Sequence, residues 1–273
     1  SDDTNGDGTD GAVIITGAAL IEPASGVTIN TSSSDGSVTF SSTVNSDANK
    51  TLTISSGAGA VDFGGIIGGV ADDHLTGLSI NAQGSSTGTG TIDILQIGDT
   101  TGPEYGVEGT VTIGNTATGD VTFDGTEYVV DGALTVTSAS GEKILFTGAG
   151  ATTVQTNQDS IQFNSGTIQL AASTPLTINS AGGAITVTSV MSAGTTADND
   201  VTINANSDFS GQNDGDTTID TETISIGAVG AVSDIGKLKL DAADGVTLTG
   251  NITLANAADA DLDVNSKAFI SGD

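Results

Sequence analysis

Short segments in which apolar and polar residues alternate recur along almost the whole chain. The clearest run lies between Gly119 and Ser189 and contains Val121-Thr122-Phe123, Leu134-Thr135-Val136, Ile161-Gln162-Phe163 and Ile185-Thr186-Val187. Successive residues of a strand point to opposite faces, so each segment places two apolar side chains on one face and a Thr or Gln on the other. Gly, Ser, Asn and Asp, which favour turns, are frequent between the segments. We therefore expect an all-β chain of many short strands.

Strands of this length predict a parallel β-solenoid. Each strand buries only two side chains, which is too little for isolated hairpins, but stacking on equivalent strands one turn away buries them all. Segments spaced about 7 to 13 residues apart give about 20 to 27 residues in each three-strand turn, so a chain of 273 residues predicts a parallel β-helix of about 10 to 13 turns. We expect residues 13–273 to form this single domain and residues 1–12 to form an acidic cap or an inter-subunit linker.

The aromatic residues have predicted places in this fold. Five of them end an apolar-polar-Phe or similar triplet, and we expect them to form an internal stack along the rod: Phe40, Phe63, Phe123, Phe146 and Phe163. Tyr105 and Tyr128 are candidates for surface contacts. Gly and Asn are expected at the corners, where the chain needs positive φ to turn from one face to the next.

The charge of the chain limits its partners. Among 273 residues there are 34 acids, five Lys and no Arg, which gives a net charge of −29. Nucleic acids, anionic membrane surfaces and polyanionic substrates would be repelled. The excess of acid favours high-salt tolerance or divalent cations. No apolar stretch is long enough to insert in a membrane. Cys is absent, so neither disulfides nor thiol chemistry is expected.

The strongest local motif suggests a calcium site at the N-terminus. Asp3, Asn5 and Asp7 alternate and Gly8 follows, which reproduces the first half of an EF-hand loop. The twelfth position of that loop, where a bidentate acid is needed, holds Ile14. Asp10 is the candidate replacement in a shorter loop, and a solvated acidic terminus is the alternative.

A second acidic stretch and the single histidine are weaker candidates. Asp259, Asp261 and Asp263 would share one outward face of a strand, where calcium or solvent would relieve their repulsion. His74 is the only His, so no second imidazole or thiol is available to complete a typical metal or catalytic site with it.

Several segments resemble the repeats of filamentous-haemagglutinin-like bacterial surface proteins. They are residues 36–40 (GSVTF), 52–54 (LTI), 57–65 (GAGAVDFGG) and 75–81 (LTGLSIN). The resemblance implies a right-handed parallel β-helix of a secreted adhesin or extracellular matrix protein, located outside the cell or at its surface. It brings no catalytic residues.

These observations favour a structural function over an enzymatic one. The two ends of a solenoid expose unpaired strands, and we expect Val13, Ile14 and Ile15 at one end and Phe269 and Ile270 at the other to be assembly edges. Head-to-tail stacking of copies would then form a surface filament or matrix fibre.

Three alternatives stay open at this point. The chain could be a stalk segment of a large secreted adhesin that contacts a host or neighbouring cell. A polysaccharide-active β-helix enzyme is disfavoured because Arg and Trp are absent. Outward Thr rows could bind a flat lattice or another ligand, although their irregular spacing along the sequence argues against ice.

Overall fold

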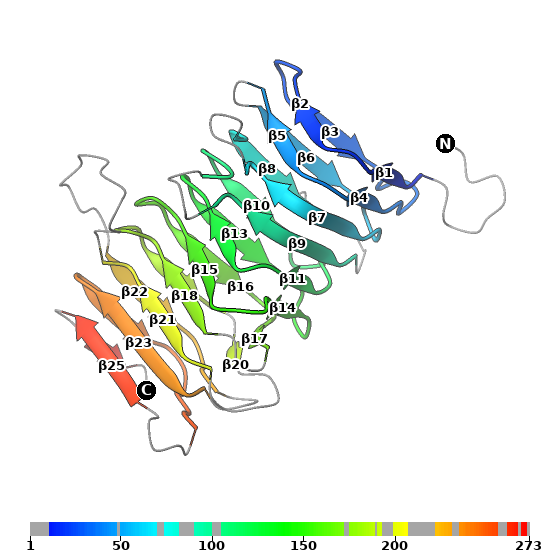
Figure 1. Ribbon diagram of the computed structural model, residues 1–273. Helices are drawn as coiled ribbons and strands as arrows, with labels where there is room; N and C mark the ends of the chain where they lie inside the picture. The colour runs from blue at the N-terminus through cyan, green and yellow to red at the C-terminus, as the bar shows by residue number, and fades with distance from the viewer. Residues whose placement is uncertain are drawn as a thin grey trace.

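The computed structural model is a parallel β-solenoid and confirms the all-β prediction (Figure 1). It describes residues 11–47, 50–69, 74–81, 90–99, 105–171, 175–188, 190–192, 199–206, 222–230, 235–255, 261–266 and 269–271. Every pairing between its named strands is parallel, as β1 with β4 illustrates. In the described part of the chain, no helix is long and apolar enough to cross a membrane.

The strands form three faces that run the length of the rod. The first face consists of β1 (Val13–Ile15), β4 (Val38–Phe40), β7 (Val61–Ile67), β9 (Ile92–Ile97), β11 (Val121–Phe123), β14 (Lys143–Phe146), β17 (Thr167–Leu170) and β20 (Val190–Ser192). The second consists of β2 (Ala19–Ile21), β5 (Val44–Ser46), β12 (Glu127–Val129), β15 (Thr152–Gln155), β18 (Leu176–Asn179), β21 (Val201–Asn204), β23 (Lys237–Ala242) and β25 (Asp261–Ser266). Because β7 and β9 run across the corner between them, these two faces form one 16-stranded sheet.

The third face is a separate sheet with one strand from each turn. Its ten strands are β3 (Val27–Asn30), β6 (Thr51–Ser55), β8 (Gly77–Ile80), β10 (Val111–Ile113), β13 (Leu134–Thr137), β16 (Ile161–Asn164), β19 (Ile185–Val187), β22 (Thr223–Ile226), β24 (Gly245–Leu248) and β26 (Phe269–Ser271). Named strands form all three faces in the first eight turns. In the turns that follow, the described part of the first face consists of isolated bridges at Val229 and Ile252.

Inward side chains stack in register along each face and form one continuous core. Val38 pairs with Val61 and Phe40 with Phe63, and all four are at most 1% exposed. In the interior turns each inward residue is covered by its equivalents in the turns before and after it, and such burial contributes about 1.5–3 kcal/mol per large apolar side chain. The register is therefore fixed by the apolar pattern, because a slip of one residue would turn every inward side chain outward.

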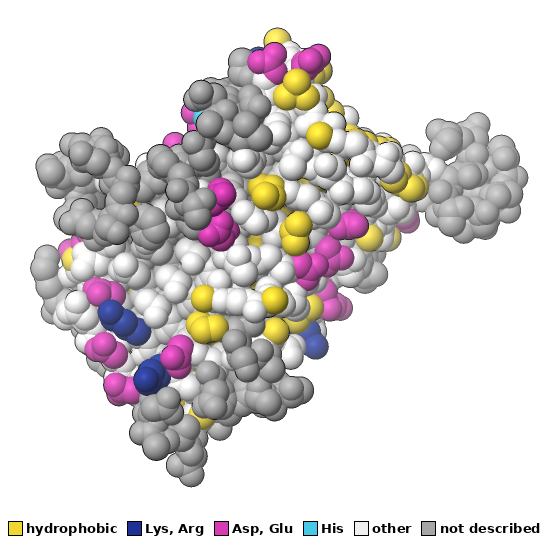
Figure 2. Space-filling model, in the orientation of Figure 1, with side chains coloured by type: hydrophobic (Ala, Val, Ile, Leu, Met, Phe, Trp, Pro, Cys, Tyr) yellow, Lys and Arg dark blue, Asp and Glu magenta, His cyan; other side chains and the backbone are white. Residues whose placement is uncertain are grey.

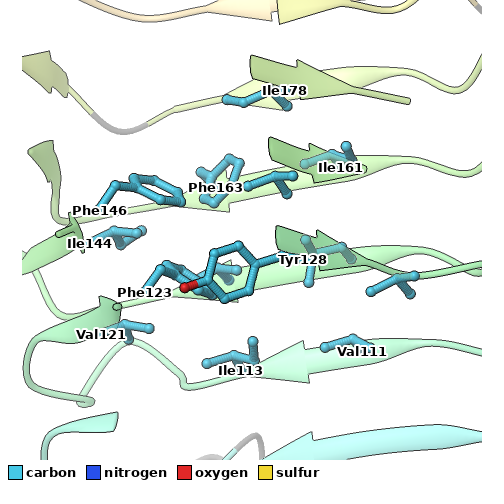
Figure 3. Close-up of a cluster of buried hydrophobic side chains, with 14 of the residues drawn as sticks. Val111, Ile113, Val121, Phe123, Tyr128, Ile144, Phe146, Ile161, Phe163 and Ile178 are labelled. Carbon is cyan, nitrogen blue, oxygen red and sulfur yellow. The ribbon is translucent and has the colours of Figure 1, made fainter. Parts of the chain in front are cut away.

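The aromatic side chains form two stacked pairs in place of the single predicted stack. Phe40 lies on Phe63 with 4.9 Å between ring centroids, and Phe123 lies on Phe146 at 5.0 Å. Ile94 separates the pairs, since it is in register with both Phe63 and Phe123. The fifth ring, Phe163, projects from the third face and meets Phe146 edge-on at 6.1 Å (Figure 3).

The prediction that Tyr128 makes a surface contact is wrong, because this side chain is fully buried. It occupies an inward position of β12, in register with Ile97 and Val154, and its ring meets Phe123 edge-on (Figure 3). Its hydroxyl accepts a hydrogen bond from the Gly125 N–H at 2.8 Å and lies 3.1 Å from the Leu95 carbonyl, to which it can donate. Burial is the main reason that the pKa of Tyr128 is raised above its usual value.

The corners confirm the expected use of positive φ. At Gly57 (φ 62°), an added Cβ would lie 2.3 Å from the Asp35 carboxylate of the preceding turn. Asn81 (φ 49°) is buried, and its side-chain oxygen accepts the Ser56 N–H at 2.8 Å while its amide nitrogen donates to the Ser56 hydroxyl at 2.9 Å. The polar groups of Asn81 and Ser56 thus satisfy one another across neighbouring turns, which ties these turns together.

Candidate functional site: the solenoid edges and outer faces

The first turn presents an unpaired edge that contains the predicted assembly residues. Among the described strands, β1, β2 and β3 pair only with β4, β5 and β6, respectively. The Val13 N–H donates to the Ser37 carbonyl at 2.8 Å, and the Ile15 carbonyl accepts the Ser41 N–H at 2.9 Å. In a parallel strand the backbone groups alternate in direction, so the N–H and C=O of Ile14 point away from the solenoid.

Apolar side chains are exposed at this same edge. Ile14 is 66% exposed and Leu20 is 51% exposed, and both occupy outward positions, in register with Thr39 and Asn45 of the next turn. The inward residues of the edge are the ones that another turn would cover. Val13 and Ile15 are only partly buried, although their equivalents in the next turn, Val38 and Phe40, are at most 1% exposed. The edge therefore has the composition of a core cross-section that another turn would cover.

The last turn forms the corresponding edge at the other end. Here β25 pairs only with β23 and β26 only with β24 among the described strands. On β25, Leu262 is 39% exposed and Val264 is partly buried. The predicted edge residues Phe269 and Ile270 lie on β26, as expected, but their side chains fall outside the described part.

The predicted calcium residues are only in part within the described chain. Asp3, Asn5, Asp7, Asp10 and Asp259 lie outside the described residues.

Asp261 and Asp263 are exposed on β25, as predicted, in register with Lys237 and Lys239 of β23. Figure 2 shows the Lys side chains among acids on this side of the molecule. Neighbouring ammonium groups can thus offset the acids' repulsion without a bound ion. The described residues contain no group of three or more His, Asp or Glu placed to hold a metal.

Several Asp residues hold the backbone of the next turn. Asp35 accepts the N–H of Ala58 at 2.7 Å and Asp120 that of Lys143 at 2.8 Å, in each case 23 residues further along the chain. A charged acceptor makes such bonds stronger than those between neutral groups. The sequence analysis did not predict this role for Asp. Its signal in the sequence is an Asp at a corner that lies 23 residues before the residue whose N–H it accepts.

Other acids face one another on the first face. Asp62 of β7 is in register with Asp93 of β9. The pKa of Asp62 is raised above its usual value, first by partial burial and then by the charges of Asp93 and Asp124. These carboxylates therefore repel one another across adjacent turns.

His74 takes part in a contact between turns. Its Nε2 lies 2.8 Å from a carboxylate oxygen of Glu108, and the adjacent Leu75 bridges to Val107. The pair joins one turn of the rod to the next, which is a structural arrangement.

The outward side of the first nine strands of the third face carries a continuous row of polar side chains, eight hydroxyls and Gln162, which we name the hydroxyl ladder. Its members are in register from strand to strand: Thr28, Thr53, Ser79, Thr112, Thr135, Gln162, Thr186, Ser225 and Thr247. On β26 the position in register with Thr247 holds Ile270. Neighbours in a parallel sheet are about 4.8 Å apart, so the row is regular. The irregular spacing of Thr along the sequence argued against a lattice-binding surface. In the structure these residues form a regular row, so that argument does not hold.

The ladder residues are outward and mostly half-buried, whereas hydroxyls in the next outward row contact backbone. Thr188 donates to the Phe163 carbonyl and Thr249 to the Ile226 carbonyl, both at 3.2 Å. Within the described chain the ladder hydroxyls have no such partner. They keep both their donor and acceptor capacity for molecules outside the protein.

No family model, curated protein or solved structure matches this chain.

Proposed function

We propose that the chain is a structural subunit of an extracellular filament or matrix fibre in which solenoids stack head to tail. The observation that carries the proposal is the first described turn, whose strands pair on one side only within the described chain. There the inward Val13 and Ile15 are only partly buried, and the backbone groups of Ile14 are directed away from the rod. An open strand edge is a template for pairing with another chain. The last turn offers β25 and β26 as the matching edge.

The two edges have the polarity that open-ended assembly needs. All the named strand pairings are parallel, so the last turn of one copy can continue into the first turn of another without reversing direction. Contacts of this kind join different surfaces on the two copies and do not close, which produces a filament. Covering the exposed part of a side chain such as Val13 or Ile15 contributes on the order of 1 kcal/mol at most.

Electron microscopy of the purified chain tests this proposal. We expect fibres with an axial repeat of about 50 Å, since ten strands at about 4.8 Å each set the length of one copy. Recording fibres with calcium and then with a chelator tests whether calcium contributes to the linkage. Single rods under both conditions, even at high protein concentration, would contradict the filament and favour a stalk segment of a larger adhesin.

A proline variant isolates the edge. Ile14→Pro removes an N–H that no described strand uses, and proline is tolerated on edge strands, so the rod should fold while fibres are lost. The control is Thr39→Pro, one turn further in, at the residue in register with Ile14. Thr39 lies on β4, which pairs with both β1 and β7, so Thr39→Pro should also lower the stability of the rod itself. Fibres of undiminished length from Ile14→Pro would contradict stacking through β1.

A further inference from the structure

We propose that the third face is a second interaction surface, on which two copies of the chain pair face to face through their hydroxyl ladders. This pairing is lateral. It involves neither end of the rod and does not depend on head-to-tail stacking.

The distribution of charge points to this face. The chain carries a net charge of −29, so two copies repel one another over most of their surfaces. The ten strands of the third face contain no Asp, Glu, Lys, Arg or His. Acids near the face, such as Asp131 and Asp244, precede its strands at the corner. The third face is therefore a neutral strip on a strongly acidic molecule, and a second copy can approach it at low electrostatic cost.

The spacing of the ladder favours a second copy over other neutral partners. A row of groups about 4.8 Å apart matches any partner at only a few points unless the partner has the same repeat. Another copy has the same repeat by construction. Each hydroxyl is both donor and acceptor, so two identical rows can satisfy one another, and an isologous pairing uses the same patch on both copies.

The size of the face fits a weak, specific dimer. Ten strands about 4.8 Å apart and about 13 Å of strand width cover on the order of 600 Å² on each copy. Stable interfaces bury about 800 Å² on each partner, and smaller ones belong to transient complexes. We therefore expect association that depends on concentration and that becomes stronger with salt, because salt screens the remaining repulsion between the acidic corners.

Cysteine cross-linking tests the pairing directly, because the chain contains no Cys. Thr135 is the middle member of the ladder, so a two-fold face-to-face arrangement in which the two ladders overlap fully brings Thr135 close to its own copy. Thr135→Cys should therefore form a disulfide-linked dimer under mild oxidation. The matched control is Thr177→Cys on β18, which also points outward, between Thr153 and Thr202, but lies on the second face. Equal cross-linking at both positions would overturn the proposal.

A charge variant gives a second measurement by sedimentation. Thr135→Glu should weaken dimerisation by about tenfold or more, since it places an acid in the centre of a contact between two acidic copies. Thr177→Glu should leave dimerisation unchanged. Because both substitutions leave β1 and β25 intact, head-to-tail fibres should persist in either variant, which separates this test from that of the filament. A wild-type chain that shows no ladder-dependent dimer at any soluble concentration or salt would overturn the proposal and leave the ladder as a surface for solvent or for another uncharged lattice.

Discussion

The two sheets of the solenoid are alike on the inside and different on the outside. Inward positions of both carry Val, Ile, Leu and Phe that are almost completely buried. On the outward side, the strands of the 16-stranded sheet carry nine charged residues: Asp62, Asp93, Glu127, Lys143, Lys237, Lys239, Asp241, Asp261 and Asp263. The strands of the ten-stranded sheet carry none. The fold therefore constrains the inward pattern in both sheets and leaves the outward pattern open to serve other purposes.

The two sheets also differ in which charged side chains lie next to one another in adjacent turns. In the 16-stranded sheet, Asp62 lies next to Asp93, whereas Lys237 and Lys239 lie next to Asp261 and Asp263. The first arrangement is repulsive and the second attractive. In the ten-stranded sheet the question does not arise, because its outward rows are neutral. Substitutions on either sheet can test whether these outward differences matter to stability.

The largest effect should come from inward positions, where the two sheets should behave alike. Phe146 of the 16-stranded sheet and Phe163 of the ten-stranded sheet are both fully buried and contact one another. Replacing either by Ala should lower the free energy of unfolding by about 3–5 kcal/mol, because each leaves a large cavity. Denaturant titration measures this loss. If Phe163→Ala were much milder than Phe146→Ala, the inner faces would not be equivalent.

A smaller loss is expected from Tyr128→Phe, which removes one atom from the core of the 16-stranded sheet. The Gly125 N–H would lose its acceptor inside the protein, which costs about 1–3 kcal/mol when a buried group is left unsatisfied. The outward variant Thr153→Val, one turn away on the same face, should change stability by less than about 0.5 kcal/mol. The unfolding temperatures of both variants compare the inward position of Tyr128 with the outward position of Thr153. Equal effects would show that the Tyr128 hydroxyl bonds do not stabilise the fold.

The sequence predicted the fold because one signal, the apolar-polar alternation, sets both the strand and its inward face. It did not predict register between distant turns, since loops of unequal length separate the strands. Members of the hydroxyl ladder are 22 residues apart from Ser225 to Thr247 but 39 apart from Thr186 to Ser225. Irregular spacing in the chain therefore hides a regular row in space.

The same limitation explains what was missed at individual sites. The lysines beside Asp261 and Asp263 lie 24 residues earlier in the chain, and only the pairing of β23 with β25 brings them together. The burial of Tyr128 depends on the tight approach of Gly125 to Leu95, where an added Cβ would lie 1.9 Å from the carbonyl oxygen. The edge residues Val13, Ile14 and Ile15 could be placed from the sequence, because β1 is the first apolar strand.

A charge reversal tests the attractive part of the outward pattern. Lys239→Asp places a third acid beside Asp263 and Asp241, and we expect it to destabilise the last turn by about 0.5–1 kcal/mol. Thr247→Asp introduces the same charge on the neutral sheet, where its neighbour Ser225 is uncharged, and should cost less. Hydrogen exchange of β25 and β26 measures the effect on the last turn. Salt should reduce the difference between the variants, and a difference that persists in high salt would argue against charge as its cause.

The smallest effect should be a gain, at the repulsive pair of the same sheet. Asp62→Asn removes one of two stacked carboxylates and should stabilise the chain at neutral pH by a few tenths of a kcal/mol, about the size of one cross-strand pair. The pKa of Asp62 in the folded chain is raised above its usual 3.8, so the folded state holds this proton more tightly than the unfolded state does. The resulting stability is present at low pH and is lost as pH rises through the raised pKa.

The advantage of Asp62→Asn over the wild type should therefore shrink on acidification, and denaturant titrations at pH 7 and near pH 3 measure it. The control is Asp120→Ala, which removes the acceptor of the Lys143 N–H and should lower stability at pH 7. If Asp62→Asn also lowered stability at pH 7, the Asp62 carboxylate would be making a favourable contact. The charges around Asp62 and Asp93 would then have to be explained by attraction, like the Lys–Asp pairs of β23 and β25.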